Sequence, residues 1–334
     1  MPISLSSMED NNTRIPPCKI IRRSIYTLLQ NYHYFTTTTA LLAFPFSATI
    51  LLSHTFIPSS SSSLLQLIYS RLEAFFEAAG FPRSSGFFTL INLKLSQTIS
   101  ANIFTLPFTL TFLLVAKASV IQALNHHKPC LQPSFSSVIS IFSHLFVTYV
   151  WNSFLIISAN ATAFCLLFFI FSFLEGLGYY TPTCLLFLSA SGAVLYSIIL
   201  ANTLIICNLS LVLSGFEKSG GHMAILKACI MIRDRASTAL TIALPVNMGM
   251  AGIEALFQYR IGEKSGILMG LEATLIAYMY SILIVLDTIM NCQFYRSCKA
   301  SSCVDQEWKY AYRIEISEED NRGYLSLKVS EEFP

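Results

Sequence analysis

The sequence predicts an all-α protein, a polytopic transmembrane helix bundle with six spans, from its low charge content and its long apolar stretches. Charged residues make up 12% of the chain and the mean hydropathy is +0.58, whereas a soluble domain carries about 25% charged residues. Six stretches reach the ~20 residues that a helix needs to cross a bilayer. A β-barrel would need alternating apolar residues, so helices are the spanning form. The expected spans are Tyr34–Ser53, Ile99–Val120, Ser143–Phe173, Cys184–Leu213, Leu240–Tyr259 and Gly266–Asn291.

The third stretch decides between six spans and seven. No charged residue, Pro or Gly occurs from Ser137 to Leu174, and we interpret this run as one long helix. Lys and Arg collect in cytoplasmic loops. With six spans, 16 of the 21 Lys and Arg residues fall on one side and five on the other, whereas a seventh span would give eight against thirteen. The sequence therefore predicts six spans with both termini in the cytosol, in an endomembrane or the plasma membrane.

Amphipathic helices are expected beside the spans. Three segments each have an apolar stripe at helical spacing, with charged residues largely outside the stripe. This pattern is typical of helices that lie in the headgroup plane. The first is the most basic, and cations of this kind favour an anionic leaflet. The segments are Pro17–Tyr32, Leu64–Ala79 and Gly220–Arg235.

Both ends of the chain are polar. Residues 1–16 are expected to be disordered, and the acidic residues ahead of the basic cluster argue against a secretory signal. The membrane domain is expected over 17–291 and a cytosolic tail over 292–334. Within the tail, alternating residues at Tyr310–Ile316 and Gly323–Val329 predict a β-hairpin.

Short motifs near the last three spans carry a resemblance to a known family. Glu217, Gly221 and Ala224 follow a Leu-Val-Leu run as acid-x3-Gly-x2-Ala, the last span closes with Phe294-Tyr295-Arg296-Ser297-Cys298-Lys299, and Tyr324 to Lys328 read Tyr-Leu-x-Leu-Lys. In these residues the chain resembles a family of plant multi-pass membrane proteins of unassigned function. The six-span layout is more distantly similar to the membrane domain of glycerophosphodiester phosphodiesterase-type proteins. Neither resemblance implies a catalytic residue.

Motifs for catalysis or cofactors do not appear in the sequence. There is no phosphate-binding Gly-rich loop, no His-Glu-x-x-His and no Gly-x-Ser-x-Gly. His126 and His127 lie near Cys130, but adjacent histidines point in different directions on a helix, so we expect a solvated loop. We therefore expect no enzyme activity, no cofactor and no metal. A net charge of +2 is too small to indicate a nucleic-acid partner, which leaves the lipid bilayer as the expected one.

Two acidic residues lie within predicted spans and form the candidate intramembrane polar site. Glu254 is about one turn from the end of the fifth span, and Glu272 lies near the start of the sixth. Because the connection is short, we expect the two carboxylates at similar depth, where they could relay a proton or cation. The structural alternative is that Arg260 and Lys264 neutralise them. Asp287 is expected to reach water at the other membrane face.

The polar and sulfur-containing residues give two further hypotheses. Asn152, Asn208 and other amides within spans are expected to join helices by hydrogen bonds. Cys292 and Cys298 follow the sixth span at the headgroup level, where thiols are candidates for S-acylation; reduced cytosolic thiols are the alternative. The favoured function is a non-catalytic protein that acts through the membrane or its cytosolic surface, and the alternative is a secondary transporter or channel that uses Glu254 and Glu272.

Overall fold

Six membrane-spanning helices organise the computed structural model, which describes residues 16–59, 63–78, 86–125, 135–176, 182–233, 235–263 and 270–300. Every regular element within these residues is a helix, and six helices are long and apolar enough to cross a membrane, as predicted. The expected β-hairpin and residues 1–15 lie outside the described part of the chain. The candidate spans are Tyr32–Ser53, Asn92–Asn125, Val138–Leu167, Ala190–Glu217, Ala236–Arg260 and Gly270–Ala300.

The first two spans form an antiparallel pair that is interrupted twice by wider turns. The chain runs through α2 (Pro17–Gln30), α3 (Tyr32–Thr38), η1 (Thr39–Ala43) and α4 (Phe44–Ser59). It returns through α5 (Ser63–Ala78), α6 (Gly86–Phe108), η2 (Thr109–Leu113) and α7 (Leu114–Asn125). Both η segments are π-helical and contact each other. Pro45 follows the first and Pro107 precedes the second, and a proline cannot donate to the carbonyl four residues earlier.

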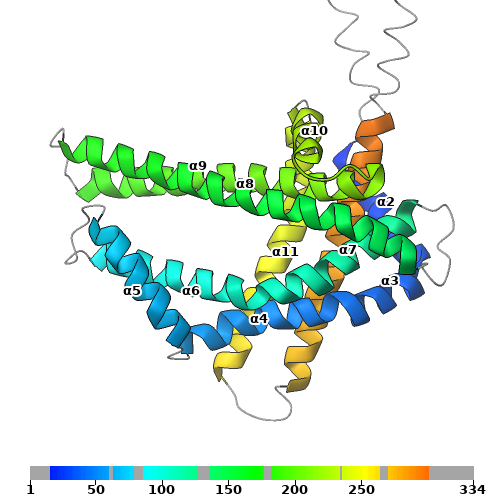
Figure 1. Cartoon of the computed structure of the whole chain (residues 1–334), viewed down its shortest axis with the longest axis horizontal. Helices are drawn as coiled ribbons and strands as arrows, with labels where there is room; N and C mark the ends of the chain where they lie inside the picture. The colour runs from blue at the N-terminus through cyan, green and yellow to red at the C-terminus, as the bar shows by residue number, and fades with distance from the viewer. Residues whose placement is uncertain are drawn as a thin grey trace, which may run out of the picture.

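The third and fourth spans are the longest helices. α8 (Phe135–Gly176) is a single helix of 42 residues, which confirms that the uncharged third stretch is one span. α9 (Pro182–Glu217) lies beside it over most of its length (Figure 1). A tight turn then leads to α10 (His222–Arg233), which packs against α8 and α9.

The last two spans run across the direction of α8 and α9 (Figure 1). They are α11 (Ala236–Glu263) and the unlabelled orange helix Gly270–Ala300, which we call the last helix. α11 contacts α2, α4 and α9. The Gln293 side-chain amide of the last helix lies 3.5 Å from the Thr27 hydroxyl of α2. We call the end of the bundle that holds α2, α10 and the end of the last helix the basic end.

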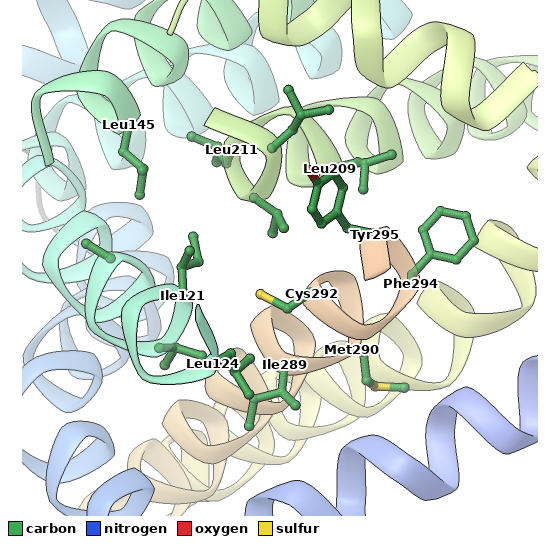
Figure 2. Packing of buried hydrophobic residues seen from close by; sticks show 14 of the residues in the cluster. Ile121, Leu124, Leu145, Leu209, Leu211, Ile289, Met290, Cys292, Phe294 and Tyr295 are labelled. Carbon is green, nitrogen blue, oxygen red and sulfur yellow. The ribbon is translucent and has the colours of Figure 1, made fainter. Parts of the chain in front are cut away.

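The main apolar core lies towards the basic end. Ile121, Leu145, Leu209 and Ile289 come from four different spans and are 1% exposed or less. Figure 2 shows them gathered around the last helix. The opposite half of α8 and α9 carries exposed aromatic side chains such as Phe169 (69%), as lipid-facing surfaces do. The bundle is therefore most tightly packed at the basic end.

Polar groups also join the spans directly. The Ser47 hydroxyl donates to the main-chain carbonyl of Ala277 at 2.9 Å, and the Tyr34 hydroxyl donates to that of Ser119 at 3.1 Å. Within hydrocarbon such bonds have no competition from water, and each contributes about 0.6 kcal/mol. They fix the first span against the last and the second.

Gly221 allows the tight turn between α9 and α10. Its φ is +80°, and its amide donates to the Thr148 hydroxyl at 3.0 Å. A side chain there would meet only ordinary contacts, because Trp151 lies 3.4 Å from an added Cβ. The backbone conformation, rather than space, therefore requires glycine.

We expect Gly221→Ala to lower the free energy of unfolding by about 1–2 kcal/mol, because a Cβ is unfavourable in the left-handed region. Gly252→Ala is the matched control, since that glycine is within a helix and has open space around it. The control should raise stability by about 0.5–1 kcal/mol. Thermal unfolding in detergent measures both, and a Gly221→Ala protein as stable as the wild type would contradict this account.

Candidate functional site

Three polar side chains from different spans meet inside the bundle, and we call them the core cluster. They are Lys117 on α7, Asn208 on α9 and Asp287 on the last helix. The Lys117 ammonium (Nζ) donates a hydrogen bond of 3.1 Å to the Asn208 side-chain oxygen (Oδ1). Asp287 is 9% exposed, and its charge acts on that of Lys117. Three spans therefore each contribute one group to a shared polar site.

The core cluster lies well inside the membrane domain. Lys117 is eight residues from the end of α7, or about 12 Å at 1.5 Å per residue, and Asp287 is thirteen residues from Ala300, or about 20 Å. Ionisable groups within membrane spans are costly and are retained where they pair with one another or serve a function. The core cluster is therefore the main candidate site of this protein.

Lys117 and Asp287 attract each other without direct contact. In the described part of the chain, the ammonium is bonded to Asn208, and no ion pair joins it to Asp287. The neutral amide of Asn291 lies one turn beyond Asp287 and donates to the main-chain carbonyl of Asp287 at 2.9 Å. It also approaches the carboxyl group. The carboxyl group is thus held among neutral groups, with a cation nearby.

A second amide extends the core cluster to the third span. Asn152 on α8 is 3% exposed and donates to the main-chain carbonyl of Cys207 at 2.9 Å. Its side-chain oxygen accepts from the Ser210 hydroxyl at 2.9 Å. The expectation that Asn152 and Asn208 join helices is confirmed. These bonds hold α8 against α9 at the level of the cluster.

The expectation that Asp287 reaches water is wrong, because its side chain is 9% exposed. Lys117, one of the 16 cations assigned to the cytosolic side, is half-buried. Both residues lie between other spans, and α7 and the last helix continue for two turns or more beyond them. The sequence signal for their burial is the apolar run around each charge. Lys117 lies within Leu114 to Val120, and Asp287 lies within Ile284 to Met290.

A second polar group, which we call the junction, closes the basic end. It consists of Phe216, Glu217, Lys227, Tyr295 and Arg296. The Glu217 carboxylate accepts a hydrogen bond from the Tyr295 hydroxyl at 2.9 Å and pairs with the Lys227 ammonium. The rings of Phe216 and Tyr295 stack with centroids 5.1 Å apart, and the Arg296 guanidinium lies over Phe216. These contacts join α9, α10 and the last helix.

Arg296 links the junction to the second span. Its guanidinium donates to the main-chain carbonyl of Leu124, in the last turn of α7. The carbonyls of a last helical turn lack partners within the helix and favour a cation. Figure 2 shows Leu124 beside Ile289, on the same side of the last helix. The end of α7 is thus held to the last helix by a polar and an apolar contact.

Glu254 and Glu272 do not share a site. The Tyr280 hydroxyl donates to Glu254 at 2.8 Å. Tyr280 is eight residues, or about 12 Å, beyond Glu272 on the last helix, so Glu254 is bonded to a residue two turns away from Glu272. Glu272 is exposed, and no ion pair joins either acid to Arg260 within the described residues. Lys264 lies outside them. Tyr280, rather than a cation, is the partner of Glu254.

The two cysteines proposed for S-acylation face the interior. Cys292 has no exposed surface and Cys298 is 4% exposed. In Figure 2 the Cys292 sulfur points into the core, on the Ile121 side of the last helix. An acyltransferase needs a thiol at the surface, so this arrangement does not present either cysteine for acylation.

Among the described residues, no three His, Cys, Asp or Glu side chains are grouped to hold a metal. His126, His127 and Cys130 lie outside the described residues.

Comparison with known proteins gives the family. The model of a domain of unknown function, DUF8558, matches residues 12–307. The chain belongs to the DUF8558 family. The match covers all six spans, so the core cluster and the junction both lie within the DUF8558 domain. No curated protein and no solved structure matches the chain. The resemblance to the plant family and to the phosphodiesterase-type membrane domain stays a prediction.

Two of the motifs that carry that resemblance meet in the DUF8558 structure. Glu217 from the first motif accepts a hydrogen bond from Tyr295 of the second. Gly221 makes the turn with positive φ, and Ala224 has no exposed surface because α10 packs closely against the bundle there. Each residue of the first motif therefore has a structural role at or beside the junction. The third motif, Tyr324 to Lys328, lies outside the described residues.

The junction can be tested by a double-mutant cycle. We expect Tyr295→Phe and Glu217→Gln each to lower the free energy of unfolding by about 1.5 kcal/mol, because each weakens a hydrogen bond to a charged group. The double variant should cost less than the sum of the two. Unfolding by denaturing detergent in bicelles measures these values. Tyr196→Phe is the control, since it removes a bond to Asn160 in the opposite half of the bundle. Additive effects of the two junction variants would show that Tyr295 and Glu217 are not coupled.

Thiol reactivity should follow burial. Cys18 is exposed and should react first with N-ethylmaleimide, whereas Cys207 and Cys292 should react only after unfolding. Cys229 on α10 should react more slowly than Cys18, because burial raises the pKa of its thiol and lowers the fraction of reactive thiolate. Peptide mass spectrometry gives the order. Hydroxylamine-sensitive acyl chains on Cys292 or Cys298 of the purified protein would show that these thiols reach the surface.

Proposed function

We propose that this DUF8558 protein is a non-catalytic multi-pass membrane protein that acts at a lipid surface, by binding anionic headgroups through α2 and α10. In this proposal the basic end, with both termini, faces the cytosol. The observation that carries it is the structure of α10, which keeps a second apolar face exposed after it has packed on the bundle. The lack of nucleotide, metal and nucleophile motifs in the sequence supports a non-catalytic role.

The two faces of α10 have different characters. Ala224, Ala228 and Ile232 are buried against the bundle. Met223, Leu226 and Ile230 are 59%, 55% and 71% exposed. Exposed apolar residues at the end of a membrane bundle suit the boundary between acyl chains and headgroups. Arg233 on the same helix is exposed, as is Lys227, which pairs with Glu217.

The helix α2 likewise has one buried face and one exposed face. Ile20 and Ser24 are buried, whereas Tyr26 and Leu29 are 64% and 61% exposed. Arg23 is also exposed, as are its neighbours Arg22 and Lys19. Cations near an anionic leaflet contribute about 1 kcal/mol each. Two cationic helices at one end of the bundle therefore support a preference for anionic lipid over neutral lipid.

A transport function through Glu254 and Glu272 has less support. The two carboxylates are at different levels, and Glu254 has a hydrogen-bond partner in Tyr280. Transporter sites usually lie near the bilayer midplane between several helices. The core cluster draws its groups from three spans, whereas the two glutamates do not share a site.

Trp151 provides a test of the lipid proposal. Its indole lies 5.7 Å from the His222 ring at the start of α10 and is 47% exposed. In a Trp308→Phe background, we expect brominated phosphatidylserine in vesicles to quench Trp151 more than brominated phosphatidylcholine does. Lys218, just before α10, and Arg233 are both exposed. Lys218→Gln with Arg233→Gln should lower the preference by about 30-fold if two charges contribute about 1 kcal/mol each, while the cations of α2 keep the remainder.

The matched control is Arg71→Gln with Lys94→Gln, two exposed cations away from the basic end. This control should keep the preference of the parent protein. Equal quenching by the two lipids in the parent protein would overturn the proposal. Loss of the preference in the control would show that the attraction is not specific to the basic end.

A further inference from the structure

The core cluster carries an inference that is independent of lipid binding at the basic end. We propose that the core cluster is a proton-binding site, in which the Asp287 carboxylate takes up and releases one proton while Lys117 stays bonded to Asn208. The step is Asp287-COO⁻ + H₃O⁺ → Asp287-COOH + H₂O. No electron moves and no other bond changes, so the net charge of the cluster rises from zero to +1.

The first observation is that Asp287 has no cation in direct contact. Within the described residues its carboxyl group is approached by the amide of Asn291, and Lys117 acts on it from a distance. Burial favours the neutral acid, because the charged form loses its hydration, and a nearby ammonium favours the carboxylate. A direct ion pair would fix the carboxylate form. Without a direct ion pair, burial favours the protonated form of Asp287 and the Lys117 ammonium favours the charged form.

The second observation is the position of Asn208. Its carbonyl oxygen accepts from the Lys117 ammonium at 3.1 Å, so the ammonium has a partner whether Asp287 is charged or neutral. Had Lys117 been bonded to Asp287 alone, protonation would have left a buried ammonium without a hydrogen bond. Such an orphaned charge costs several kcal/mol. Asn208 therefore makes both protonation forms of Asp287 compatible with the same packing.

The third observation concerns the helix that carries Lys117. Lys117 is part-buried, and its neighbours Ala116 and Ala118 and the next turn at Ile121 are 2% exposed or less. The π-helical segment η2 ends at Leu113, one turn before Lys117, and contacts η1 of the first span. Such segments are frequent at functional sites. The helix that carries Lys117 is thus irregular next to the cluster.

The titratable groups around Asp287 come from two neighbouring spans and from its own helix. Lys117 comes from α7, and Cys207, buried on α9, is next to Asn208 in the chain. Cys292 lies on the same helix as Asp287 and is itself influenced by Arg296 of the junction. The thiols are buried and neutral in this account, so Lys117 is the group whose charge controls the proton on Asp287.

Infrared difference spectroscopy of the full chain in liposomes tests the proposal. Acidification of the wild type should produce a protonated-carboxyl C=O component that shifts in D₂O and is missing from the spectrum of Asp287→Asn, which separates it from the bands of the other carboxyl groups. Glu254→Gln and Glu272→Gln are the controls, because each removes a membrane carboxyl group outside the cluster, and both should keep this component. Identical pH-dependent carboxyl bands in the wild type and in Asp287→Asn would overturn the proposal.

A second variant keeps the test decisive if Asp287→Asn does not fold. In Lys117→Met the cation that favours the carboxylate is gone, so the band should form at a higher pH than in the wild type, by about one pH unit or more. A band that titrates identically in Lys117→Met and wild type would show that the titrating group is not next to Lys117. These results do not depend on anionic lipid, so their failure and that of the lipid proposal are distinguishable.

Discussion

A polar group inside the hydrocarbon layer must find its partner within the protein, and the arrangement of spans around the last helix follows from this constraint. At successive levels, the last helix provides the carbonyl of Ala277 to Ser47 and the hydroxyl of Tyr280 to Glu254. Nearer the basic end it contributes Asp287 to the core cluster and Tyr295 to the junction. Each of these polar groups on the last helix thus interacts with a different neighbouring helix. Apolar packing alone could not do this, because lipid tails are as apolar as the side chains that they would replace.

The polar contacts are distributed unequally along the bundle. The core cluster, the junction and the main apolar core lie towards the basic end, where α7, α9 and the last helix converge. In the opposite half of α8 and α9, the bond between Tyr196 and Asn160 joins exposed residues, and the surrounding aromatic side chains face outward. Local stability follows the density of buried contacts. The half with the termini is therefore the rigid part, and the long arms of α8 and α9 depend more on the surrounding lipid.

The fold could be predicted from the sequence because a span needs only length and apolar composition. The uncharged run from Ser137 to Leu174 was enough to identify one helix, and α8 confirms it. Partners could not be predicted in the same way, because helix composition does not specify how two spans are rotated towards each other. Lys117 and Asp287 are 170 positions apart, and nothing local in either span identifies the other. Glu254 and Glu272 misled for the converse reason: nearness in sequence suggested a pair, whereas the packing gave Glu254 to Tyr280.

The junction and the core cluster differ in how much free energy their polar contacts contribute. At the junction, the side chains of Lys227 and Glu217 are 54% and 21% exposed, and a surface ion pair of this kind contributes about 0–1 kcal/mol. Even with the Tyr295 hydrogen bond, the junction adjusts the stability of an end that water already reaches. In the core cluster, water cannot replace a lost partner, and an unpaired buried charge costs about 3–5 kcal/mol. Lys117 is therefore tolerated because Asn208 bonds to it, and the charged form of Asp287 offsets its charge further, from two helices that must be correctly placed. The same requirement explains why a deep lysine occurs where α7, α9 and the last helix meet, rather than on the lipid-facing side of α7.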